Sequence, residues 1–407
     1  MPDIASMLDK APAPVRSLAQ RVAGGRGALG RLADAIRFRY RPEDVPALPP
    51  IADTAIRLTI GPANSAGEAY QWARAAERFL PDLSALAVRG IGSDTFLPAV
   101  DLRVPVGVYQ RSHAWHDSFE SFLSQQTHVI WESGYPLLGR RYGSDVRREA
   151  AVLEGAGVRG ALMFHGSDIR PPAAHAAANP WSPFADAQPA ARALESEAAR
   201  NAALVAEARL PSFVSTPDLL EWLPDATWCP VVIDPARWQA AAEVERPTGR
   251  PVVVHAPSSA WLKGSGLIEP LLQRLSDEGV IEYRRVVNVP HASMPAFYAD
   301  ADVVLDQFVL GIYGVAACEA MAAGRLVMSH VAPFSRETVR ERTGYELPVH
   351  EVTLESLQAE LLRFAATPEA FESVRAAGPA FVRSVHDGRL SAAAFAPFLG
   401  VRPHATA

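Results

Sequence analysis

The chain of 407 residues has little cysteine, no large excess of one charge and no long apolar run. Its two cysteines, Cys229 and Cys318, stand far apart and make neither a metal-ligand spacing nor a disulfide framework, which fits a reducing cytosol. Because 39 basic residues face 45 acidic ones, the net charge of −6 argues against nucleic acid as a partner. A membrane-spanning helix is not expected, since that needs a run of about 18 apolar residues.

Several catalytic signatures are missing as well. The chain has no Gly-x-Ser-x-Gly nucleophile elbow, and no Gly-x-Gly-x-x-Gly follows the first expected strand, which argues against a nicotinamide dehydrogenase. His113 and His116 lack the i, i+4 spacing of a helical metal pair and have one nearby carboxylate, Asp117, so no metal site is predicted here. This stretch is either an acceptor loop in which Trp115 stacks on a sugar or an ordinary packed segment.

The N-terminal segment is basic. Residues 14–42 carry seven arginines against a single acid, Asp34, and their apolar residues follow helical steps. Two interpretations stay open. One is an interfacial helix that lies on anionic lipid at the inner face of the membrane, and the other is a helix packed on the body of the protein.

From residue 55 onward, the chain alternates between β-branched runs and helical stretches, and a polar linker at 234–251 divides this alternation into two series. Such alternation is typical of parallel sheets with helices on both faces. In the first series we expect strands at 55–60, 85–88, 128–132, 161–165, 212–215 and 230–233, and helices at 68–79 and 189–208. In the second we expect strands at 251–255, 282–287, 301–306 and 326–329, and helices at 266–278, 294–299, 314–323 and 354–365.

The first motif, His-Ala-Pro-Ser-Ser-Ala-Trp-Leu-Lys-Gly-Ser-Gly, runs from His255 to Gly266 between an apolar strand and a helix. The amides at a helix N-terminus, together with Lys263, make a site for phosphate or pyrophosphate. An exposed Lys-Gly turn is the alternative interpretation.

The second motif runs from Asp306 to Gly324, where a strand leads through a glycine-containing turn into an apolar helix. Gly311 and Gly314 allow the backbone to approach a ligand closely. Glu319 stands among alanines and a cysteine on this helix. It either accepts the hydroxyl groups of a ribose or forms a salt bridge in the core.

Together the two motifs resemble the donor-binding half of GT-B glycosyltransferases of the retaining family 4 type. The elements HAPSS…KG and GxYGxxxxEAMAxG stand about 50 residues apart, in the order that this family has. The resemblance is strong over 250–330 and extends by architecture over 55–385. It implies an α/β protein of the GT-B class, in which two Rossmann-like domains with parallel sheets face a central cleft.

The resemblance also implies a division of the chain. We expect a basic N-terminal segment and linker at 1–50, an acceptor domain at 51–233 and a nucleotide-sugar donor domain at 234–385. The last segment, 386–407, is expected to cross back to the acceptor domain.

Roles for single residues follow from the same resemblance. Lys263 would hold the donor diphosphate and neutralise it as it leaves, Glu319 would hold the ribose, and the amides of Val315 and Ala316 would meet the phosphates. No metal or other cofactor is expected. The remaining residues of the expected donor site are Ser259, Asp306, Gly311, Tyr313 and Gly314.

The sequence departs from the family at two positions. The family has paired glutamates eight positions apart, and the position eight before Glu319 is Gly311. Asp306, which precedes the glycines, is a candidate to act in place of the missing carboxylate. The usual arginine shortly before Lys263 is also absent.

A third group of residues lies in the first series. By the resemblance, His165 or Asp168 lies near the reacting sugar and acceptor, and Arg170 offers a bidentate contact to phosphate or carboxylate. A strand-end turn capped by Asp168 is the alternative. The other expected elements of the cleft are the loop with Gly61, Asn64 and Gly67, and the segment 171–189, which is either a lid or a surface excursion.

These observations lead to a cytoplasmic glycosyltransferase that moves a hexose from a nucleoside diphosphate sugar to a hydroxyl acceptor and retains the anomeric configuration. The acceptor is a glycan, a lipid-linked molecule or a small molecule. Three rivals stay open: a catalytically degenerate homologue that binds nucleotide or glycan as a partner subunit, an epimerase that acts on its own donor, and an enzyme at the membrane surface.

Overall fold

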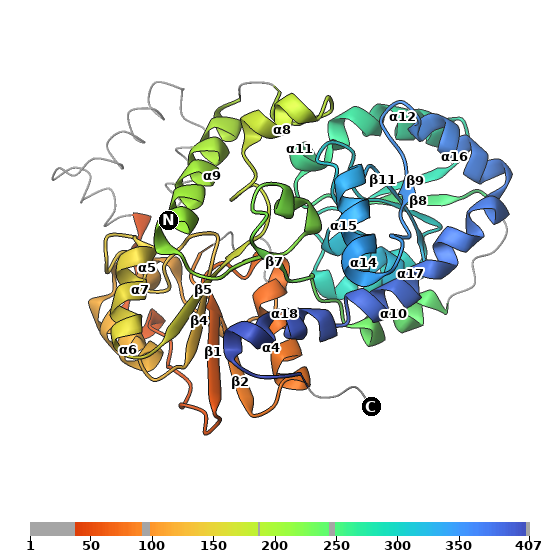
Figure 1. The fold of residues 1–407 in the computed structure, drawn as a ribbon. Coiled ribbons are helices and arrows are strands. Elements are labelled where there is room, and N and C mark those ends of the chain that lie inside the picture. The colour runs from red at the N-terminus through yellow and green to blue at the C-terminus, as the bar shows by residue number, and fades with distance from the viewer. Residues whose placement is uncertain (1–36, 92–97, 186–187, 244–248, 404–407) are drawn as a thin grey trace.

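The computed structural model describes residues 37–91, 98–185, 188–243 and 249–403. Two parallel sheets, each covered by helices, lie side by side and are built one after the other along the chain (Figure 1). Most of the basic segment 14–42, with its expected helix, lies outside the described residues. Within the described ranges, no helix is both long and apolar enough to cross a membrane.

The first sheet has seven parallel strands in the order β3-β2-β1-β4-β5-β6-β7. β1 and β4 are fully or largely buried because they are the central strands, although Arg57 and Thr59 interrupt the apolar residues of β1. The strands are β1 Ile56–Gly61, β2 Leu83–Arg89, β3 Leu102–Arg103, β4 His128–Glu132, β5 Arg159–Phe164, β6 Ser212–Val214 and β7 Thr227–Trp228.

The second sheet has five parallel strands in the order β12-β11-β10-β8-β9. The central strands β8, β10 and β11 are buried on both faces, as a helix-covered parallel sheet requires. The strands are β8 Val252–His255, β9 Glu282–Arg285, β10 Val303–Leu305, β11 Leu326–Ser329 and β12 His350–Glu351.

Helices cover both sheets, and α8 and α9 extend from the first half toward the second (Figure 1). The helices of the first half are α4 Glu68–Phe79, α5 Val106–Arg111, α6 His113–Leu123, α7 Val146–Gly155, α8 Pro172–Ala178 and α9 Pro189–Ala208. Those that follow are α10 Pro235–Ala242, α11 Ala260–Lys263, α12 Ser265–Asp277, α13 Met294–Ala299, α14 Val315–Ala322, α15 Pro333–Thr343, α16 Leu357–Ala366, α17 Glu372–Val385 and α18 Arg389–Leu399.

The C-terminal helix returns to the first half of the molecule. α18 packs against α4, and its apolar face joins the core beneath β1 and β5 (Figure 1). Phe395 packs edge-on against Trp72 and Phe213, both of which belong to the first half. The chain therefore crosses between the halves twice, once after β7 and once after α17.

The expected strand at 230–233 is wrong. These residues are irregular, and their backbone groups bond to side chains and to the second crossing instead of to a neighbouring strand. The Val232 N–H donates to Glu68 Oε2 at 2.8 Å, and the Ile233 N–H donates to the His386 carbonyl at 2.7 Å. The imidazole Nδ1 of His386 in turn lies 2.8 Å from the Val231 carbonyl. The apolar run was therefore a buried linker, which local pattern cannot distinguish from a buried strand.

Candidate active site

Each sheet has one topological switch point, where the strand order reverses and the loops on either side diverge. In the first sheet it lies between β1 and β4, and in the second between β8 and β10. Ligands of open α/β sheets bind outside the carboxyl ends of the strands at such points. In the second half, the predicted site residues follow β8 and β10, which flank its switch point. In the first half, Asn64 and Gly67 follow β1, whereas His165, Asp168 and Arg170 follow β5.

At the second switch point, Lys263 forms an ion pair with Asp306. Lys263 ends α11, which follows β8, and Asp306 comes directly after β10. The side chain of Asp306 is 2% exposed and that of Lys263 is 16% exposed, so the carboxylate is buried and the lysine side chain is partly exposed. The two loops also bond directly, because the Phe308 N–H donates to the Lys263 carbonyl at 3.2 Å.

Gly264 allows these two loops to pack closely. It adopts the left-handed conformation with φ +74°, and a Cβ there would lie 2.7 Å from Cγ1 of Val309. Ser259, which was predicted to touch the donor, caps α11 through its Oγ, which accepts the Leu262 N–H at 3.4 Å. The loop between β8 and α12 is thus held by the Ser259 cap, by the left-handed Gly264 and by the ion pair of Lys263.

Glu319 is held in place by His291. It lies on α14 with its side chain 7% exposed, and His291 Nε2 contacts its Oε1. His291 Nδ1 faces Arg237 Nη1 at 3.2 Å, and Arg237 also donates to the His291 carbonyl at 2.5 Å. Since a guanidinium only donates, Nδ1 is an acceptor and Nε2 carries the proton that is donated to Glu319. A hydrogen bond from His291 therefore fixes one carboxylate oxygen of Glu319.

The turn before α14 contains two of the predicted glycines. Gly311 has φ +70°, and a Cβ there would lie 3.1 Å from that of Ala332. The backbone at this position therefore favours glycine, and a glutamate in its place would be strained. Gly314 caps α14, and Val315 and Ala316, which are half-buried, form its first turn.

Tyr313 does not reach the surface of the site with its side chain. It is buried, and its hydroxyl lies 3.4 Å from His386 Nε2 at the second crossing. Burial raises the pKa of Tyr313 well above its usual value and lowers the pKa of His386 to about 4. Tyr313 and His386 are therefore both uncharged. Their contact connects the turn before α14 to the segment where the chain crosses back to the first half. The Tyr313 side chain is thus engaged within the fold, and a contact of this residue with the donor would have to come from its backbone.

At the first switch point, the buried carboxylate of Glu132 organises the loop after β1. Its Oε2 accepts the N–H groups of Ala63 and Asn64 at 3.0 Å and 2.7 Å. Its Oε1 lies 3.0 Å from His165 Nε2. Burial lowers the pKa of His165, but contact with Glu132 and the charge of Asp168 outweigh burial and raise it above its usual value. Sequence analysis missed Glu132, which looked like the last residue of a strand.

His165 follows β5 and stacks on Trp72, with ring centroids 5.6 Å apart and an angle of 14° between the planes. Asp168 has a different role from the predicted one. Its carboxylate accepts the backbone N–H groups of His165 and Gly166 and the hydroxyl of Ser133. Both of its oxygens are used to close the turn, so the structure agrees with the alternative interpretation, in which Asp168 is a cap.

Two predicted contacts with the acceptor are wrong. Trp115 is buried in α6 and stacks on Phe119 with ring centroids 4.8 Å apart, so it cannot stack on a sugar. Arg170 is also buried, and its guanidinium pairs with Asp218 at 2.5 Å. Asp218 lies 48 residues away along the chain, so local sequence could not reveal this partner.

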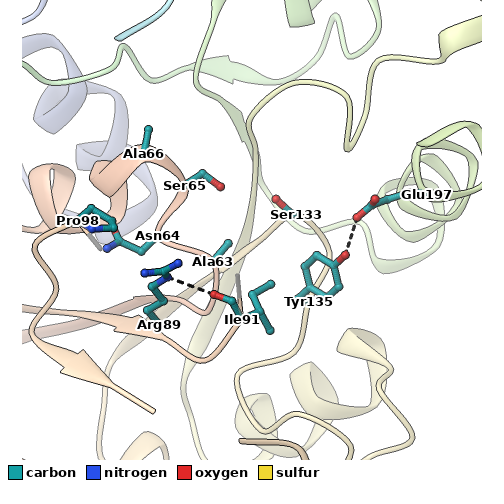
Figure 2. A pocket seen from close by; sticks show the side chains of 10 residues that line it. All are labelled: Ala63, Asn64, Ser65, Ala66, Arg89, Ile91, Pro98, Ser133, Tyr135 and Glu197. Atoms are coloured by element: carbon teal, nitrogen blue, oxygen red, sulfur yellow. Dashed lines mark hydrogen bonds between the residues drawn. The ribbon is translucent and has the colours of Figure 1, made fainter. Parts of the chain in front are cut away.

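A pocket of about 480 Å³ opens at the carboxyl end of the first sheet (Figure 2). The loop after β1 forms one wall, Arg89 at the end of β2 and Ile91 beyond it form another, and Tyr135 and Glu197 lie opposite. The Tyr135 hydroxyl donates to Glu197 at 2.7 Å, and burial with this contact raises the pKa of Tyr135 to about 12. The pocket is lined by Ala63, Asn64, Ser65, Ala66, Arg89, Ile91, Pro98, Ser133, Tyr135 and Glu197.

The loop after β1 places its three predicted residues differently. Asn64 lines the pocket, but its side chain holds the loop, since Nδ2 donates to the Ala99 carbonyl and Oδ1 accepts the Tyr70 N–H. Gly61 is closely packed, and a Cβ there would lie 2.7 Å from the Val88 carbonyl oxygen. Gly67 has φ +89° and precedes α4.

Glu68 holds the segment that follows β7. It begins α4, is buried and accepts the Val232 N–H. Burial raises the pKa of Glu68 well above its usual value, and the negative charges of Glu319 and Glu132 raise it further.

One carboxylate pair lies away from this region. Asp300 and Asp302 form an Asp-x-Asp sequence just before β10, at the opposite end of the strand from Asp306. Asp302 accepts the Val252 N–H at 2.7 Å, and Asp300 pairs with Arg284 at 3.4 Å. Both side chains therefore make contacts at the end of the sheet where its strands begin, away from the candidate site.

No protein-family model matches this sequence, and no curated protein matches it. Solved structures match it over most of its length. Sucrose-phosphate synthase from Thermosynechococcus elongatus is 13% identical with a TM-score of 0.54, and the match covers 84% of this chain and 97% of that one. HepE from Anabaena, in complex with UDP and glucose, is 12% identical with a TM-score of 0.52 over 84% and 99% of the chains.

A glycosyltransferase from Rickettsia africae gives a similar result, with 9% identity, a TM-score of 0.52 and coverage of 84% of this chain and 96% of that one. The likeness at these identities is one of fold. The two parallel sheets and the matches together confirm the predicted GT-B fold.

Proposed function

We propose that this protein is a glycosyltransferase that moves a hexose from a nucleoside diphosphate sugar to a hydroxyl acceptor with retention and without a metal ion. The observation that carries the proposal is the placement of Lys263, Asp306 and Glu319 at the switch point of the second sheet. A cation for a diphosphate and a carboxylate for a ribose lie there beside the N-terminus of α14, whose amides favour anions.

The first half supplies the acceptor side in this proposal. The 480 Å³ pocket lies at the end of the first sheet, and Ser133 in its wall contacts Asp168 in the turn after His165. His165 has a raised pKa, so its protonated form persists to a higher pH than in a free histidine. We infer that this charge faces the donor sugar and its diphosphate, whose negative charge grows as the bond to the sugar breaks.

The proposed reaction is a front-face substitution. The bond between the anomeric carbon and the diphosphate oxygen breaks, the acceptor oxygen bonds to the same face, and its proton passes to the leaving phosphate. Lys263 and the N-terminus of α14 neutralise the leaving group. Two further facts support the donor class: the fold is that of glycosyltransferases, and the similar HepE structure contains UDP and glucose.

The test is a thermal-shift panel of UDP, GDP, ADP and dTDP and their glucose derivatives with the wild type and with Lys263→Met and Glu319→Gln. A ligand at 100 times its dissociation constant adds about 2.7 kcal/mol of stability. We expect one base to stabilise the wild type and both variants to respond less. Incubation of that nucleotide sugar with a panel of hydroxyl acceptors, followed by NMR of the anomeric proton, then tests transfer and retention.

Three results would count against the proposal. A protein that responds to no nucleotide would not have this donor site. A protein that binds donor yet neither transfers nor hydrolyses it would be the degenerate homologue. A donor converted to its epimer without acceptor would identify an epimerase instead.

A further inference from the structure

One segment of the first half lies against both loops of the proposed donor site. We call it the strap and define it as Pro172–Ala185, which comprises α8 and the turn after it. Figure 1 shows α8 extending toward α11 and the second sheet. The sequence left open whether this region is a lid or a surface excursion, and the structure places it in contact with the other half.

The strap holds the backbone of the turn that precedes α14. Asn179 Nδ2 donates to the Val309 carbonyl at 3.1 Å, and His175 Nε2 lies 3.1 Å from the Leu310 carbonyl. These carbonyls directly precede Gly311, so the contacts act where the chain enters the turn. The same turn is held from within, because the Leu310 N–H donates to the Gln307 side chain at 3.0 Å.

Aromatic residues of the strap contact the neighbouring loops. Phe184 packs edge-on against Trp261, which lies two residues before Lys263, with ring centroids 5.7 Å apart. Trp181 packs edge-on against His330 at 4.8 Å, and its indole N–H donates to Glu355 at 2.7 Å. The strap therefore touches the second half at three places around the donor site.

Hydrogen bonds within the strap, and one to α9, hold its shape. His175 is buried, and its Nδ1 lies 2.7 Å from the Ser182 hydroxyl, while Asn179 Oδ1 accepts the Trp181 N–H at 2.9 Å. The Ala173 N–H donates to Glu195 on α9 at 2.7 Å, which fastens the strap to the first half. Burial lowers the pKa of His175, so its ring is neutral and Nε2 donates to the Leu310 carbonyl.

We propose that Asn179 and His175 are positioning residues of the donor site, supplied by the opposite half of the molecule. They fix the carbonyls of Val309 and Leu310 and thereby the turn Gly311–Gly314 on which α14 begins. This inference rests on the proposed function, because it takes that turn to bind the donor. Two residues of the first half would thus hold a turn of the donor site in the second half.

The test compares two single variants. Asn179→Ser keeps an oxygen that can accept the Trp181 N–H but is too short to reach the Val309 carbonyl, and it adds no charge. Glu355→Ala is the matched control, because it removes another contact between strap and second half without touching the turn. Nucleotide affinity is measured by calorimetry with UDP, or with GDP, ADP or dTDP if the thermal-shift panel selects one of them. Hydrogen exchange of peptide 307–314 is measured without nucleotide.

We expect Asn179→Ser to weaken nucleotide binding about 3- to 10-fold, the worth of one hydrogen bond, and to speed exchange of the turn. Glu355→Ala should leave both values within about twofold of the wild type, since its contact does not hold the turn. An unchanged affinity or an unchanged exchange rate in Asn179→Ser would overturn the inference. A wild type that binds no nucleotide would instead refute the proposed function and the donor-site role with it, and the exchange data would still show whether the strap holds the turn.

Discussion

Lys263 and Asp306 are ion-paired across the switch point of the second sheet, with the Asp306 carboxylate buried and the Lys263 side chain 16% exposed. The lysine is thus oriented before any ligand arrives, and Asp306 keeps it from folding back onto the protein. A diphosphate that bound here would gain a cation whose position is already fixed, which lowers the entropy cost of the contact.

The pair predicts a difference between single and double variants. Lys263→Met should lose nucleotide affinity at least 10-fold, because a charge-assisted hydrogen bond is worth about 1.5–3 kcal/mol. It should also lose stability, since it leaves the buried Asp306 charge unpaired. Adding Asp306→Asn to it should restore much of the stability and none of the affinity. Urea unfolding and calorimetry measure the two effects, and a double variant that binds nucleotide would contradict the role of Lys263.

Glu319 predicts a preference for ribose. We expect the wild type to bind a nucleoside diphosphate at least 10-fold more tightly than its 2′,3′-dideoxy analogue, because a buried carboxylate left without its hydroxyl partners is costly. Glu319→Gln should narrow this ratio to about threefold or less, since neutral hydrogen bonds are weaker than charge-assisted ones. Calorimetry with both nucleotides gives the ratio. An equal affinity ratio in the wild type and in Glu319→Gln would contradict a contact between Glu319 and the ribose.

His165 predicts a pH dependence of stability. Because contact with Glu132 raises its folded-state pKa, protonated His165 stabilises the fold fully below about pH 6.5, its usual pKa. That contribution is lost as the pH rises through the raised pKa. Between pH 6 and pH 9, the wild type should therefore lose more unfolding free energy than His165→Gln does. Urea titrations at pH 6 and pH 9 measure this difference. Equal losses of unfolding free energy in the wild type and in His165→Gln would show that the contact with Glu132 does not stabilise the protonated form of His165.

Two glycines near Lys263 predict opposite effects. Gly264→Ala should destabilise the protein by about 1–3 kcal/mol and weaken nucleotide binding, because φ is +74° there and the new Cβ would meet Val309. Gly266→Ala is the matched control. It lies in α12 with open space around it, so alanine should stabilise the protein by up to about 1 kcal/mol. Thermal unfolding of both variants tests this, and a neutral Gly264→Ala would mean that the two loops need no close approach.

Much of the fold could be predicted from local pattern. The helices Glu68–Phe79, Pro189–Ala208 and Met294–Ala299 and the strands His128–Glu132 and Leu326–Ser329 agree with the sequence to the residue. Their limits coincide with glycine, proline or polar residues, which are local signals. The short elements at β3, β12 and α11 were not predicted, since two to four residues are too few for a periodic pattern. The longer helices α6, α7, α15 and α17 were missed as well.

The site was less accessible to sequence analysis, because its most organising residues act over long distances along the chain. Glu132 holds backbone groups 68 and 69 residues away, and His291 contacts Glu319 across 28 residues. Neither position carries a local motif. Arg170 looked available for a ligand for the same reason, since its partner Asp218 could not be inferred from the surrounding residues.

The most direct test of the donor site uses the composition of the chain. Its only lysines are Lys10 and Lys263. Acetylation with acetic anhydride, quantified by mass spectrometry of both peptides, can therefore follow Lys263 with Lys10 as an internal reference. If the nucleotide selected by the panel binds as proposed, it should slow acetylation of Lys263 several-fold and leave Lys10 unchanged. Equal acetylation of Lys263 with and without saturating nucleotide would contradict a donor diphosphate at this lysine.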